Sequence, residues 1–553
     1  MWRKKAESRE PRAGGHPLTL DPRPSTRQSR VLRTIIGFLI LPSVFCLPWS
    51  LAASPVAGEV NLAYVAKLAQ ERAQHPFRSP RADLPKVLQN LDYDKYRQIR
   101  FRRDRALWRA DGLPFQIEFF HPGYLYQEPV HVYEFTATHW QPIRFAVNFF
   151  DYGKLDIQNQ IPADTGYAGF RIINELNKTN QWDELGAFLG ASYFRLLGKG
   201  QVYGQSARGL ALDCGELDRP EEFPIFTDWW LGKPKKEDTD LTLYGLLDSV
   251  SCAGAYRFIV RPGDITVADV EAVIFLREPK DVLAADPKRK VPVAPNTIGM
   301  APLTSMFWFG KNSERKFDDY RPEVHDADGL LIHMGDGEML WRPLDNPSVL
   351  RHQIFHAPNI QGFGLLQRER SFAAYQDLNN QPQDEPSVWV QPRGNWGDGD
   401  LHLVQLSGNF EGLDNIVAFW DPRDKPAPMQ RFEFGYTLYW QKADGDLKLS
   451  ENRVVSTRVG LVPGSNIRQF AIDFKGPKLD ALSPTNAPEA IANCSTNAAI
   501  VDNLVLYNPY LKSWRVMLKL QPKPGNNPVD MRCTLQKGTN ILSETWTYQW
   551  SPP

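Results

Sequence analysis

The sequence lacks a surplus of charge of one sign. Its 553 residues include 64 Lys and Arg and 64 Asp and Glu, so the formal net charge is zero at neutral pH. A nucleic-acid-binding protein usually carries a basic surplus that is concentrated on one face. The composition therefore gives no reason to expect nucleic acid as a partner.

Several catalytic motifs are also absent. The chain contains no GxSxG, HExxH, CxxC or GxxxxGK[ST], so a hydrolase nucleophile elbow, a zinc peptidase, a thioredoxin site and a P-loop are unsupported. His352 and His356 are four positions apart, a spacing that brings two imidazoles together on a helix, but the surrounding SVLRHQIFHAPN is typical of extended chain. We therefore expect neither a metal nor another cofactor.

Long apolar runs are scarce. The one at 35–51 is interrupted by two prolines and follows a polar segment rich in Arg and Lys, the order typical of a secretory signal peptide. Small residues predict cleavage near Ala52 or Ala53, so we assign residues 1–53 to the signal and expect an exported, soluble mature chain. A retained membrane anchor is the alternative, which the prolines disfavour.

Cysteine is scarce too. After the signal peptide four remain, Cys214, Cys252, Cys494 and Cys533, and none has metal-ligand spacing. An oxidising compartment permits disulfides, and four cysteines allow three pairings. The members of Cys214/Cys252 and of Cys494/Cys533 fall within the same expected domain. Free buried thiols are the alternative.

What is present is typical of β-structure. Aromatic residues make up 12% of the chain, and 44 Pro accompany 39 Gly. Apolar spacing predicts short helices at 61–73 and 84–99. Beyond Phe101, apolar or alternating segments recur at roughly 8 to 15 positions between turn residues, which predicts an all-β protein built on a large antiparallel sandwich.

A charged stretch poor in apolar residues, at 444–454, predicts a linker. About seven short strands follow it, which fit an immunoglobulin-like sandwich at 455–553. The expected domains are therefore a large β-sandwich that binds and acts on the ligand at 54–443 and a small immunoglobulin-like domain after the linker.

One segment concentrates chemistry. Residues 322–345, PEVHDADGLLIHMGDGEMLWRPLD, hold six carboxylates, two histidines and Trp341. We interpret this segment as a hairpin, or two short strands, with acidic loops. One interpretation of the acids is that Asp-Gly pairs form turns and the carboxylates face water. The other is a rim of carboxylates and a flat ring beside a cleft, as carbohydrate chemistry requires.

Rings and arginines gather in two further segments, at 188–213 and 362–400. Flat rings can stack on the CH faces of sugars, and guanidinium groups can donate to hydroxyls. In the first segment, tight turns explain the glycines equally well. In the second segment, a position at the edge of the hydrophobic core explains the rings. Together with Trp341, the candidates for substrate binding are Tyr193, Arg195, Tyr203, Arg208, Tyr375, Trp389, Arg393 and Trp396. We expect the rings of Trp389 and Trp396 to be exposed.

The same segments resemble the family of periplasmic glucan biosynthesis proteins G and D (OpgG/OpgD, also MdoG/MdoD), with the closer similarity to G-type members. The motifs that carry the resemblance occur in order from about Ala63 to the end of the chain: FLGASYFR, GQVYGQSARGLALD, EEFP, APLTSMFWFG, YRPEVHDADGL, GDGEMLWRPLDNP, QGFGLLQRER, WGDGDLHLVQL, LDNIVAFW and LSETWTYQW. The resemblance implies a galactose-mutarotase-like β-sandwich with a deep cleft, an immunoglobulin-like C-terminal domain and a periplasmic role in making osmoregulated glucans with a β-1,2-linked glucose backbone.

The resemblance also implies catalytic roles, because members of the family are recognised as inverting glycoside hydrolases that cleave β-1,2-glucan. The acid matches Asp414 in LDNIVAFW, and the base matches Asp326 in VHDADGL, with Asp328 as a rival base. Protons are expected to pass through a substrate hydroxyl or a water chain. From the residues themselves, Asp414 borders an apolar strand and is the expected donor, whereas Asp326 is expected to be the better solvated acid. The alternative function is a non-catalytic glucan-binding factor that assists a membrane glucosyltransferase or a branching enzyme.

Overall fold

The computed structural model describes residues 56–289, 293–313, 317–442, 447 and 449–552. Strands hold 45% of the chain and helices 11%, with several antiparallel sheets, which confirms the all-β prediction. The expected signal peptide and part of the expected linker lie outside the described residues. Among the helices within them, none is both long enough and apolar enough to cross a membrane.

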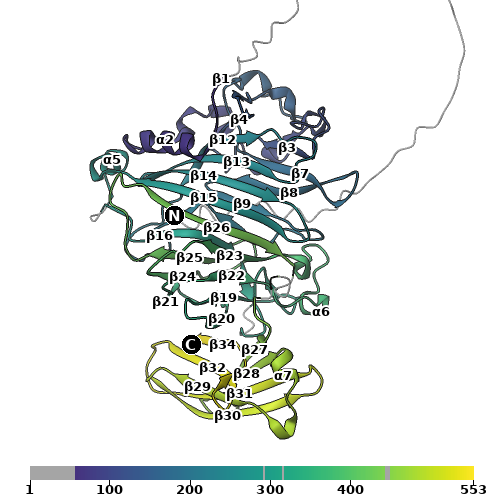
Figure 1. Cartoon of the computed structure of the whole chain (residues 1–553), viewed down its shortest axis with the longest axis vertical. Helices are drawn as coiled ribbons and strands as arrows, with labels where there is room; N and C mark the ends of the chain where they lie inside the picture. Colours follow the sequence, from purple (N-terminus) through teal and green to yellow (C-terminus); the bar gives the residue numbers. More distant parts are fainter. Residues whose placement is uncertain (1–55, 290–292, 314–316, 443–446, 448, 553) are drawn as a thin grey trace, which may run out of the picture.

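The longer of two large sheets runs the whole length of the molecule (Figure 1). Most of its neighbouring strands are antiparallel, and turn residues between them set this pattern. In spatial order its strands are β1 (Val56–Ala57), β5 (His139–Pro142), β4 (His131–Phe135), β12 (Ile225–Gly232), β13 (Leu241–Asp248), β14 (Cys252–Arg261), β15 (Thr266–Leu276), β26 (Phe432–Gln441), β23 (Ser387–Arg393), β22 (Gly362–Leu366), β19 (Gly329–His333), β20 (Met339–Pro343), β34 (Thr545–Trp550), β32 (Val529–Lys537) and β29 (Glu489–Cys494), with β33 (Asn540–Ile541) beside β32.

The second large sheet packs against the first and carries the strand that follows Asp414. Its spatial order is β21 (Arg351–His356), β24 (Gly399–Gln405), β25 (Ile416–Pro422), β16 (Ile298–Ser305), β10 (Ser206–Arg208), β9 (Tyr193–Leu196), β8 (Gln181–Leu189), β7 (Gly169–Lys178) and β3 (Phe115–Phe120), with β11 (Leu210–Leu212) beside β16.

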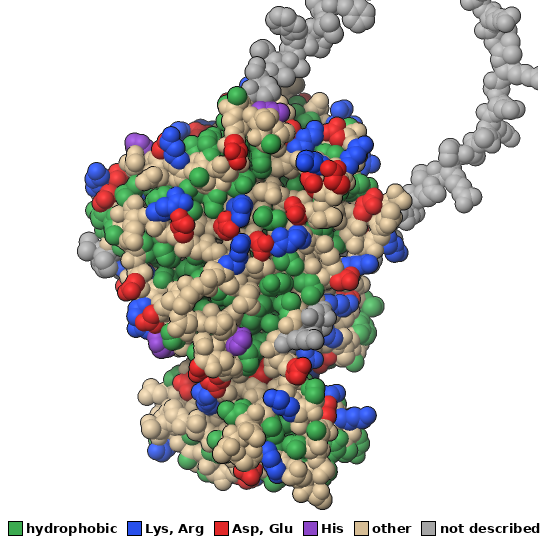
Figure 2. Space-filling model, in the orientation of Figure 1, with side chains coloured by type: hydrophobic (Ala, Val, Ile, Leu, Met, Phe, Trp, Pro, Cys, Tyr) green, Lys and Arg blue, Asp and Glu red, His purple; other side chains and the backbone are tan. Residues whose placement is uncertain are grey.

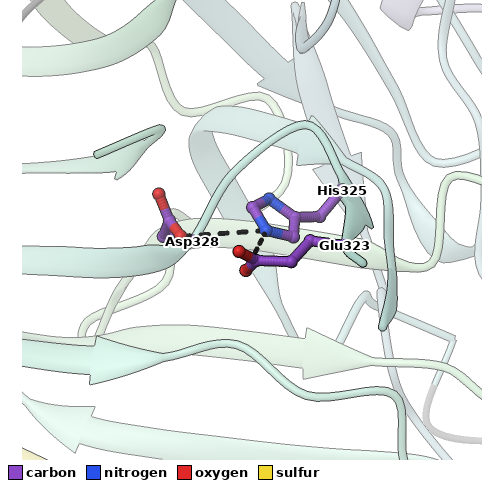
Figure 3. Close-up of side chains that lie close together, drawn as sticks. All are labelled: Glu323, His325 and Asp328. Atoms are coloured by element: carbon purple, nitrogen blue, oxygen red, sulfur yellow. Dashed lines mark hydrogen bonds and ion pairs between the residues drawn. The ribbon is translucent and has the colours of Figure 1, made fainter. Parts of the chain in front are cut away.

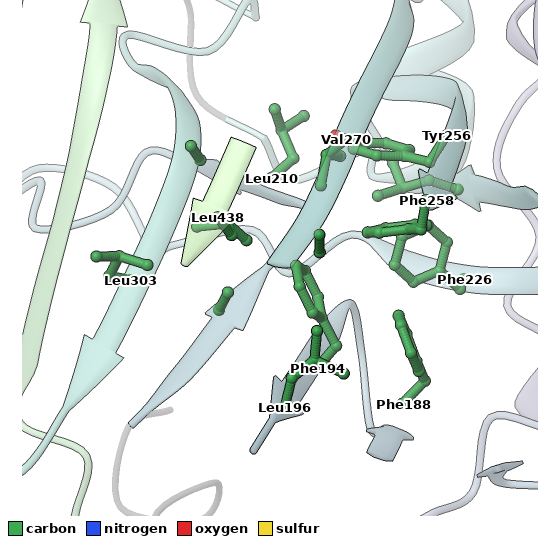
Figure 4. Close-up of a cluster of buried hydrophobic side chains, with 14 of the residues drawn as sticks. Phe188, Phe194, Leu196, Leu210, Phe226, Tyr256, Phe258, Val270, Leu303 and Leu438 are labelled. Carbon is green, nitrogen blue, oxygen red and sulfur yellow. The ribbon is translucent and has the colours of Figure 1, made fainter. Parts of the chain in front are cut away.

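Aromatic side chains fill the space between these two sheets (Figure 4). Phe258 of the longer sheet lies between Phe188 and Phe194 of the second sheet, with ring centroids 5.4 and 5.2 Å apart. All three rings are buried. Burying one such ring stabilises the fold by about 1.5 to 3 kcal/mol, so this layer holds the sandwich together.

The C-terminal lobe pairs a four-stranded sheet with the end of the longer sheet. The four strands are β27 (Arg453–Leu461), β28 (Arg468–Lys475), β31 (Ser513–Pro522) and β30 (Ala498–Asn508). Phe470 of this sheet faces Trp546 of β34, with ring centroids 5.9 Å apart. Because β34 also pairs in parallel with β20, the longer sheet continues from the main body into this lobe. The domain boundary stays a prediction.

Helices are short and peripheral, and one expectation about them was wrong. Helix α2 (Leu62–Ala73) confirms the first predicted helix, with the Asn61 side chain capping its start. The second is broken into α3 (Lys86–Gln89) and α4 (Tyr93–Tyr96), because Asp92 accepts a hydrogen bond from the Lys95 N–H and starts a new helix. The remaining helices are α5 (Pro279–Ala285), α6 (Phe372–Tyr375) and α7 (Pro477–Asp480).

Two further details bear on the predictions. The segment IRFAVNFF at 143–150 has the composition predicted for a strand beyond Phe101, but it is mostly a loop with one 3₁₀ turn at Val147–Phe149. All four cysteines after the expected signal are free thiols: in the β29–β32 register Cys494 faces Met531 and Cys533 faces Ala492, so these two are not opposite each other.

Candidate functional site

The acidic segment forms the expected hairpin, but its acids do not all face water. Strands β19 and β20 pair in antiparallel fashion with Leu331 opposite Trp341. Before them, β18 (Val324–His325) pairs with β17 (Phe307–Phe309). Glu323 is 4% exposed and Asp326 has no exposed surface, so the interpretation that all these acids are solvated is wrong for both. Asp326 was also expected to be the better solvated catalytic candidate, whereas Asp414 is the one that is partly exposed.

The fold brings the segments of Asp326 and Asp414 together at β17. The Asp326 N–H donates to the carbonyl of Met306 over 2.9 Å. The next residue, Phe307, donates its N–H to the Asn415 side chain over 2.8 Å and accepts from it over 2.9 Å. The two chain segments that contain the candidate acids therefore meet at the same dipeptide although they are far apart in sequence.

An arginine ties the loops that precede both acids. Arg321 lies 2.6 Å from the Glu411 carboxylate and 2.9 Å from that of Asp377, and it also pairs with Asp319. Glu411 is three positions before Asp414, and Arg321 is five before Asp326. A charged network thus holds both loops against the segment that contains α6.

On either side of Asp326 in the sequence, Glu323, His325 and Asp328 form a largely buried ionisable cluster (Figure 3). The His325 Nε2 is 3.4 Å from Glu323 and 3.8 Å from Asp328, and its Nδ1 is 3.0 Å from the Gln367 side chain. The imidazole also stacks on Phe307 with centroids 5.2 Å apart. The residue before Asp326 is therefore held on every side.

Charge balance sets the protonation of this cluster. Burial disfavours the charged imidazole, but the carboxylates of Asp328 and Glu323 outweigh it and raise the pKa of His325. Burial likewise opposes ionisation of Glu323, yet His325 and Lys311 lower its pKa overall. Lys311 lies 3.2 Å from Glu323 and also pairs with Glu369. The donor atoms of Glu323, His325 and Asp328 are close enough to hold a metal ion, but a lysine cation already occupies their neighbourhood, so they fit an ion-pair network better.

A small cavity opens beside this cluster at the junction with the C-terminal lobe. Its lining includes Lys311, His325, Asp328 and Arg368 from the main body and residues 454–457 from β27. Its volume of about 30 Å³ holds one or two water molecules but no sugar ring. The cavity can thus supply water beside the Asp326 segment.

Three of the predicted aromatic binding residues are buried. Trp389 is 1% exposed, with its ring against Gly362 and Gly364, so the expectation that this ring is exposed was wrong. Tyr375 has no exposed surface, and its ring meets His325 edge-on at 5.4 Å. Trp341 is 3% exposed and lies under the Arg368 guanidinium at 3.6 Å. Packing inside the protein explains all three better than sugar contact does.

The arginines of the 188–213 segment form cation–π pairs inside the protein. Arg208 is 3% exposed, covers the Tyr193 ring at 4.7 Å and pairs with Glu221 at 2.6 Å, so the expectation that it offers free donors was wrong. Arg195 covers the Tyr203 ring at 4.2 Å, and the Tyr203 hydroxyl donates to Glu184. These pairs stiffen β9 and β10.

Two candidates from the 387–400 region remain accessible. Arg393 is exposed and lies 3.2 Å from Glu271. Trp396 is half-buried, donates its indole N–H to the Gly435 carbonyl and packs at 5.3 Å from Trp420. Trp396 therefore keeps part of its ring for a ligand while the rest anchors its loop.

Sequence reasoning missed residues that shape the site. The Gln205 amide donates to the Asp326, Leu365 and Pro386 carbonyls at 3.0 to 3.3 Å, which fixes three segments at once. Tyr320 is 76% exposed and Phe410 is 43% exposed, and each directly precedes a member of the Arg321–Glu411 pair. An aromatic next to a charged residue in a loop was the only sequence signal for these two rings.

Comparison with known proteins supports the resemblance. The family model described as periplasmic glucan biosynthesis protein, MdoG, matches residues 61–550. Glucans biosynthesis protein G of Pseudomonas aeruginosa strain LESB58 is 42% identical over 496 residues, which cover 88% of this chain and 91% of that protein. The same figures hold for glucans biosynthesis protein G of P. aeruginosa strain PAO1 and of Pseudomonas paraeruginosa strain PA7. The family name supports a periplasmic location. Matching almost all of the chain beyond its first sixty residues, these comparisons show that the protein belongs to the MdoG family of periplasmic glucan biosynthesis proteins.

Proposed function

We propose that this protein is an inverting hydrolase that cleaves the β-1,2-linked glucose backbone of osmoregulated periplasmic glucans during their biosynthesis. In this proposal residues 1–53 are a signal peptide that is removed on export. Asp414 protonates the leaving oxygen, and Asp326 activates the attacking water. No cofactor takes part.

The observation that carries the proposal is that the segments containing the two acids converge on Met306 and Phe307. The Asp326 backbone is bonded to the first of these residues, and the Asn415 side chain is bonded to the second. Inverting hydrolysis needs two carboxyl groups about 6.5 to 9.5 Å apart, with room between them for substrate and water. Rigid anchoring of both loops favours such a fixed separation.

The surroundings of the two acids suit the assigned roles. Asp414 is partly exposed, so a glycosidic oxygen can approach it. Asp326 is buried, which suits a base that reaches its water through a substrate hydroxyl or a second water. The exposed rings of Tyr320 and Phe410 flank the Arg321–Glu411 pair and offer flat faces for glucose units, with the accessible part of Trp396 as a further ring.

The test compares chain length before and after incubation of purified mature protein with linear β-1,2-glucan. Wild type should shorten the glucan. Asp414→Asn and Asp326→Asn should each lower turnover by about 10²- to 10⁴-fold while glucan affinity changes little, because both groups act in the transition state. Asp328→Asn tests whether Asp328, the rival base, is needed for turnover. The Asp328 carboxylate already accepts hydrogen bonds from the Arg368 and Glu369 N–H groups. Near-normal turnover in both Asp414→Asn and Asp326→Asn would overturn the assignment.

The burial of Asp326 is also compatible with a second function. If no substrate hydroxyl or water connects the buried Asp326 to the scissile bond, the protein binds glucan and presents it to a membrane glucosyltransferase without cutting it. Binding of linear β-1,2-glucan with no shortening over long incubation would support this non-catalytic role and reject the hydrolase.

A further inference from the structure

Helix α2 lies near the other end of the longer sheet (Figure 1). Side chains of this helix and of the neighbouring strands line a groove. It is bordered by α2 and by strands β4, β5, β12 and β13, none of which carries a residue of the candidate site. Its volume is about 510 Å³, within the range of roughly 300 to 1,000 Å³ that is typical of small-molecule sites. The central residues of its lining are Tyr64, Leu68, Arg72, Tyr133, Trp140 and Trp230.

Four rings build one wall of this groove at fixed angles. Tyr133 stacks on Trp230 at 5.2 Å and 17°, and it meets Trp140 edge-on at 5.2 Å and 90°. Tyr64 meets Trp230 edge-on at 6.0 Å. Tyr64, Tyr133 and Trp140 are each only partly buried, so their surfaces are available to a ligand. Flat apolar surfaces of this kind match the CH faces of a pyranose ring.

Polar groups face the rings. The Arg72 guanidinium is 3.4 Å from Asp228 and 3.4 Å from Asp248, and its side chain is 45% exposed. The Tyr133 hydroxyl is 3.4 Å from Asp228. Charge-assisted hydrogen bonds are normally about 2.7 to 2.9 Å long, so these contacts are loose enough for a ligand hydroxyl to join them. Arg277 holds Asp248 at 2.6 Å and keeps this side rigid.

The charges that line the groove balance. Its acids are Glu71, Asp228 and Asp248, its guanidinium groups belong to Arg72, Arg78 and Arg277, and His75 also lines it. Neither an anion nor a cation is selected by such a lining. A neutral ligand with many hydroxyl groups, which accepts from arginine and donates to carboxylate, fits it best.

We propose that this groove is a second saccharide-binding site that takes glucose units of the glucan away from the two acids. The saccharide class follows from the rings and the balanced polar groups, whereas its identity as β-1,2-glucan rests on the proposed function. A site of this kind holds a long chain on the protein while another part of the chain lies at Asp326 and Asp414, which raises the local concentration of substrate.

Calorimetry with a short linear β-1,2-glucan tests this inference. The reference is the mature protein carrying Asp414→Asn, because this substitution prevents turnover of the glucan. Adding Trp140→Ala, which removes a ring, or Leu68→Trp, which fills the groove, should abolish one class of binding site or weaken it about tenfold or more. Tyr510→Ala, a change at a 94% exposed ring in the C-terminal lobe, is the control and should leave binding unchanged. Melting temperatures identify any variant that has lost its fold.

Hydrogen exchange, measured on the same reference protein, tests the inference without any substitution in the groove. Saturating glucan should slow exchange in α2 and β5. Unchanged exchange there, together with unchanged binding by folded Leu68→Trp, would overturn the inference. The hydrolase proposal has its own test, because it fails when wild type leaves the glucan length unchanged. In that case, slower hydrogen exchange in α2 with glucan bound would still establish the second site.

Discussion

Two tryptophans seven positions apart show how much the local environment decides at the residue scale. Trp389 lies on β23, where its ring covers two glycines of the neighbouring strand β22. Trp396 lies in the loop after β23 and keeps part of its surface exposed. The same residue type is therefore core in one case and available to a ligand in the other.

Replacing Trp389 by Ala should destabilise the protein by about 3 to 5 kcal/mol, because it leaves a cavity in a fully packed cluster. Trp396→Ala should cost less and weaken glucan binding. Denaturant unfolding of both variants, with Tyr510→Ala as the exposed control, measures the difference. A Trp389→Ala variant as stable as wild type would contradict the buried placement of the ring.

His325 should make stability depend on pH. Its pKa is raised in the folded state because Asp328 and Glu323 outweigh burial, while Lys311 opposes them. A raised folded pKa means that the stabilisation is complete below the unfolded value of about 6.5 and is lost as pH rises through the folded pKa. The stability advantage of wild type over His325→Gln should therefore shrink as pH rises from about 5.5 through the raised folded pKa of His325.

Urea unfolding of both proteins across this range measures the effect. The lower limit keeps Glu323 ionised, since its pKa lies below its ordinary value. The Glu369 carboxylate and the Tyr375 ring also face this cluster. Glu369→Gln is therefore a useful second variant. A difference between wild type and His325→Gln that does not change with pH would contradict the ion-pair description.

At the scale of elements, one buried ion pair joins the segment after β22 to the start of β34. Arg368 and Glu544 are 2.7 Å apart, and their side chains are 4% and 0% exposed. Glu544 also accepts from the Val454 N–H over 2.9 Å at the start of β27. The guanidinium lies on the Trp341 ring at 3.6 Å. This pair therefore fixes the main body against the C-terminal lobe.

Glu544→Ala should destabilise the protein by about 3 to 5 kcal/mol, because it strands a buried positive charge. The matched control is Asp398→Ala, which breaks the half-exposed Arg423–Asp398 pair and should cost less than about 1 kcal/mol. Denaturant midpoints report both values. Equal effects of the two substitutions would show that the Arg368–Glu544 pair is solvated.

For the whole molecule, the shared sheet makes the C-terminal lobe part of the main fold. Figure 2 shows a narrow waist between the two lobes, but β20 and β34 pair across it. One hydrophobic cluster also combines Leu331, Trp341, Leu366 and Trp389 with side chains of the C-terminal lobe. On the visible face, charges of both signs are intermixed, as the balanced composition predicts.

Removing residues 453–553 should therefore yield an aggregating main body. The truncation leaves β20 as an exposed edge and uncovers the apolar side chains that the C-terminal lobe covers. Soluble yield and size-exclusion elution, compared with the full mature chain, measure the outcome. A monomeric, cooperatively melting fragment would show that the main body is independent of the lobe.

The sequence by itself determined most of the elements. Alternating strands, helix α2, the hairpin at 322–345 and the family followed from local patterns, because side-chain period and turn residues act within a few positions. Those patterns also singled out Asp326 and Asp414, through a resemblance carried by intact motifs.

Only the tertiary structure decided which polar and aromatic groups meet. Asp326, Trp389 and Arg208 are buried only because strands from separate parts of the chain pair in the folded protein. The hydrogen bonds of Gln205 with Asp326 and of Asn415 with Phe307 each join residues more than a hundred positions apart. Burial and charge pairing are sums over such distant neighbours. The amphipathic ring wall under α2 arose in the same way, since β4, β5, β12 and α2 meet only in the folded chain.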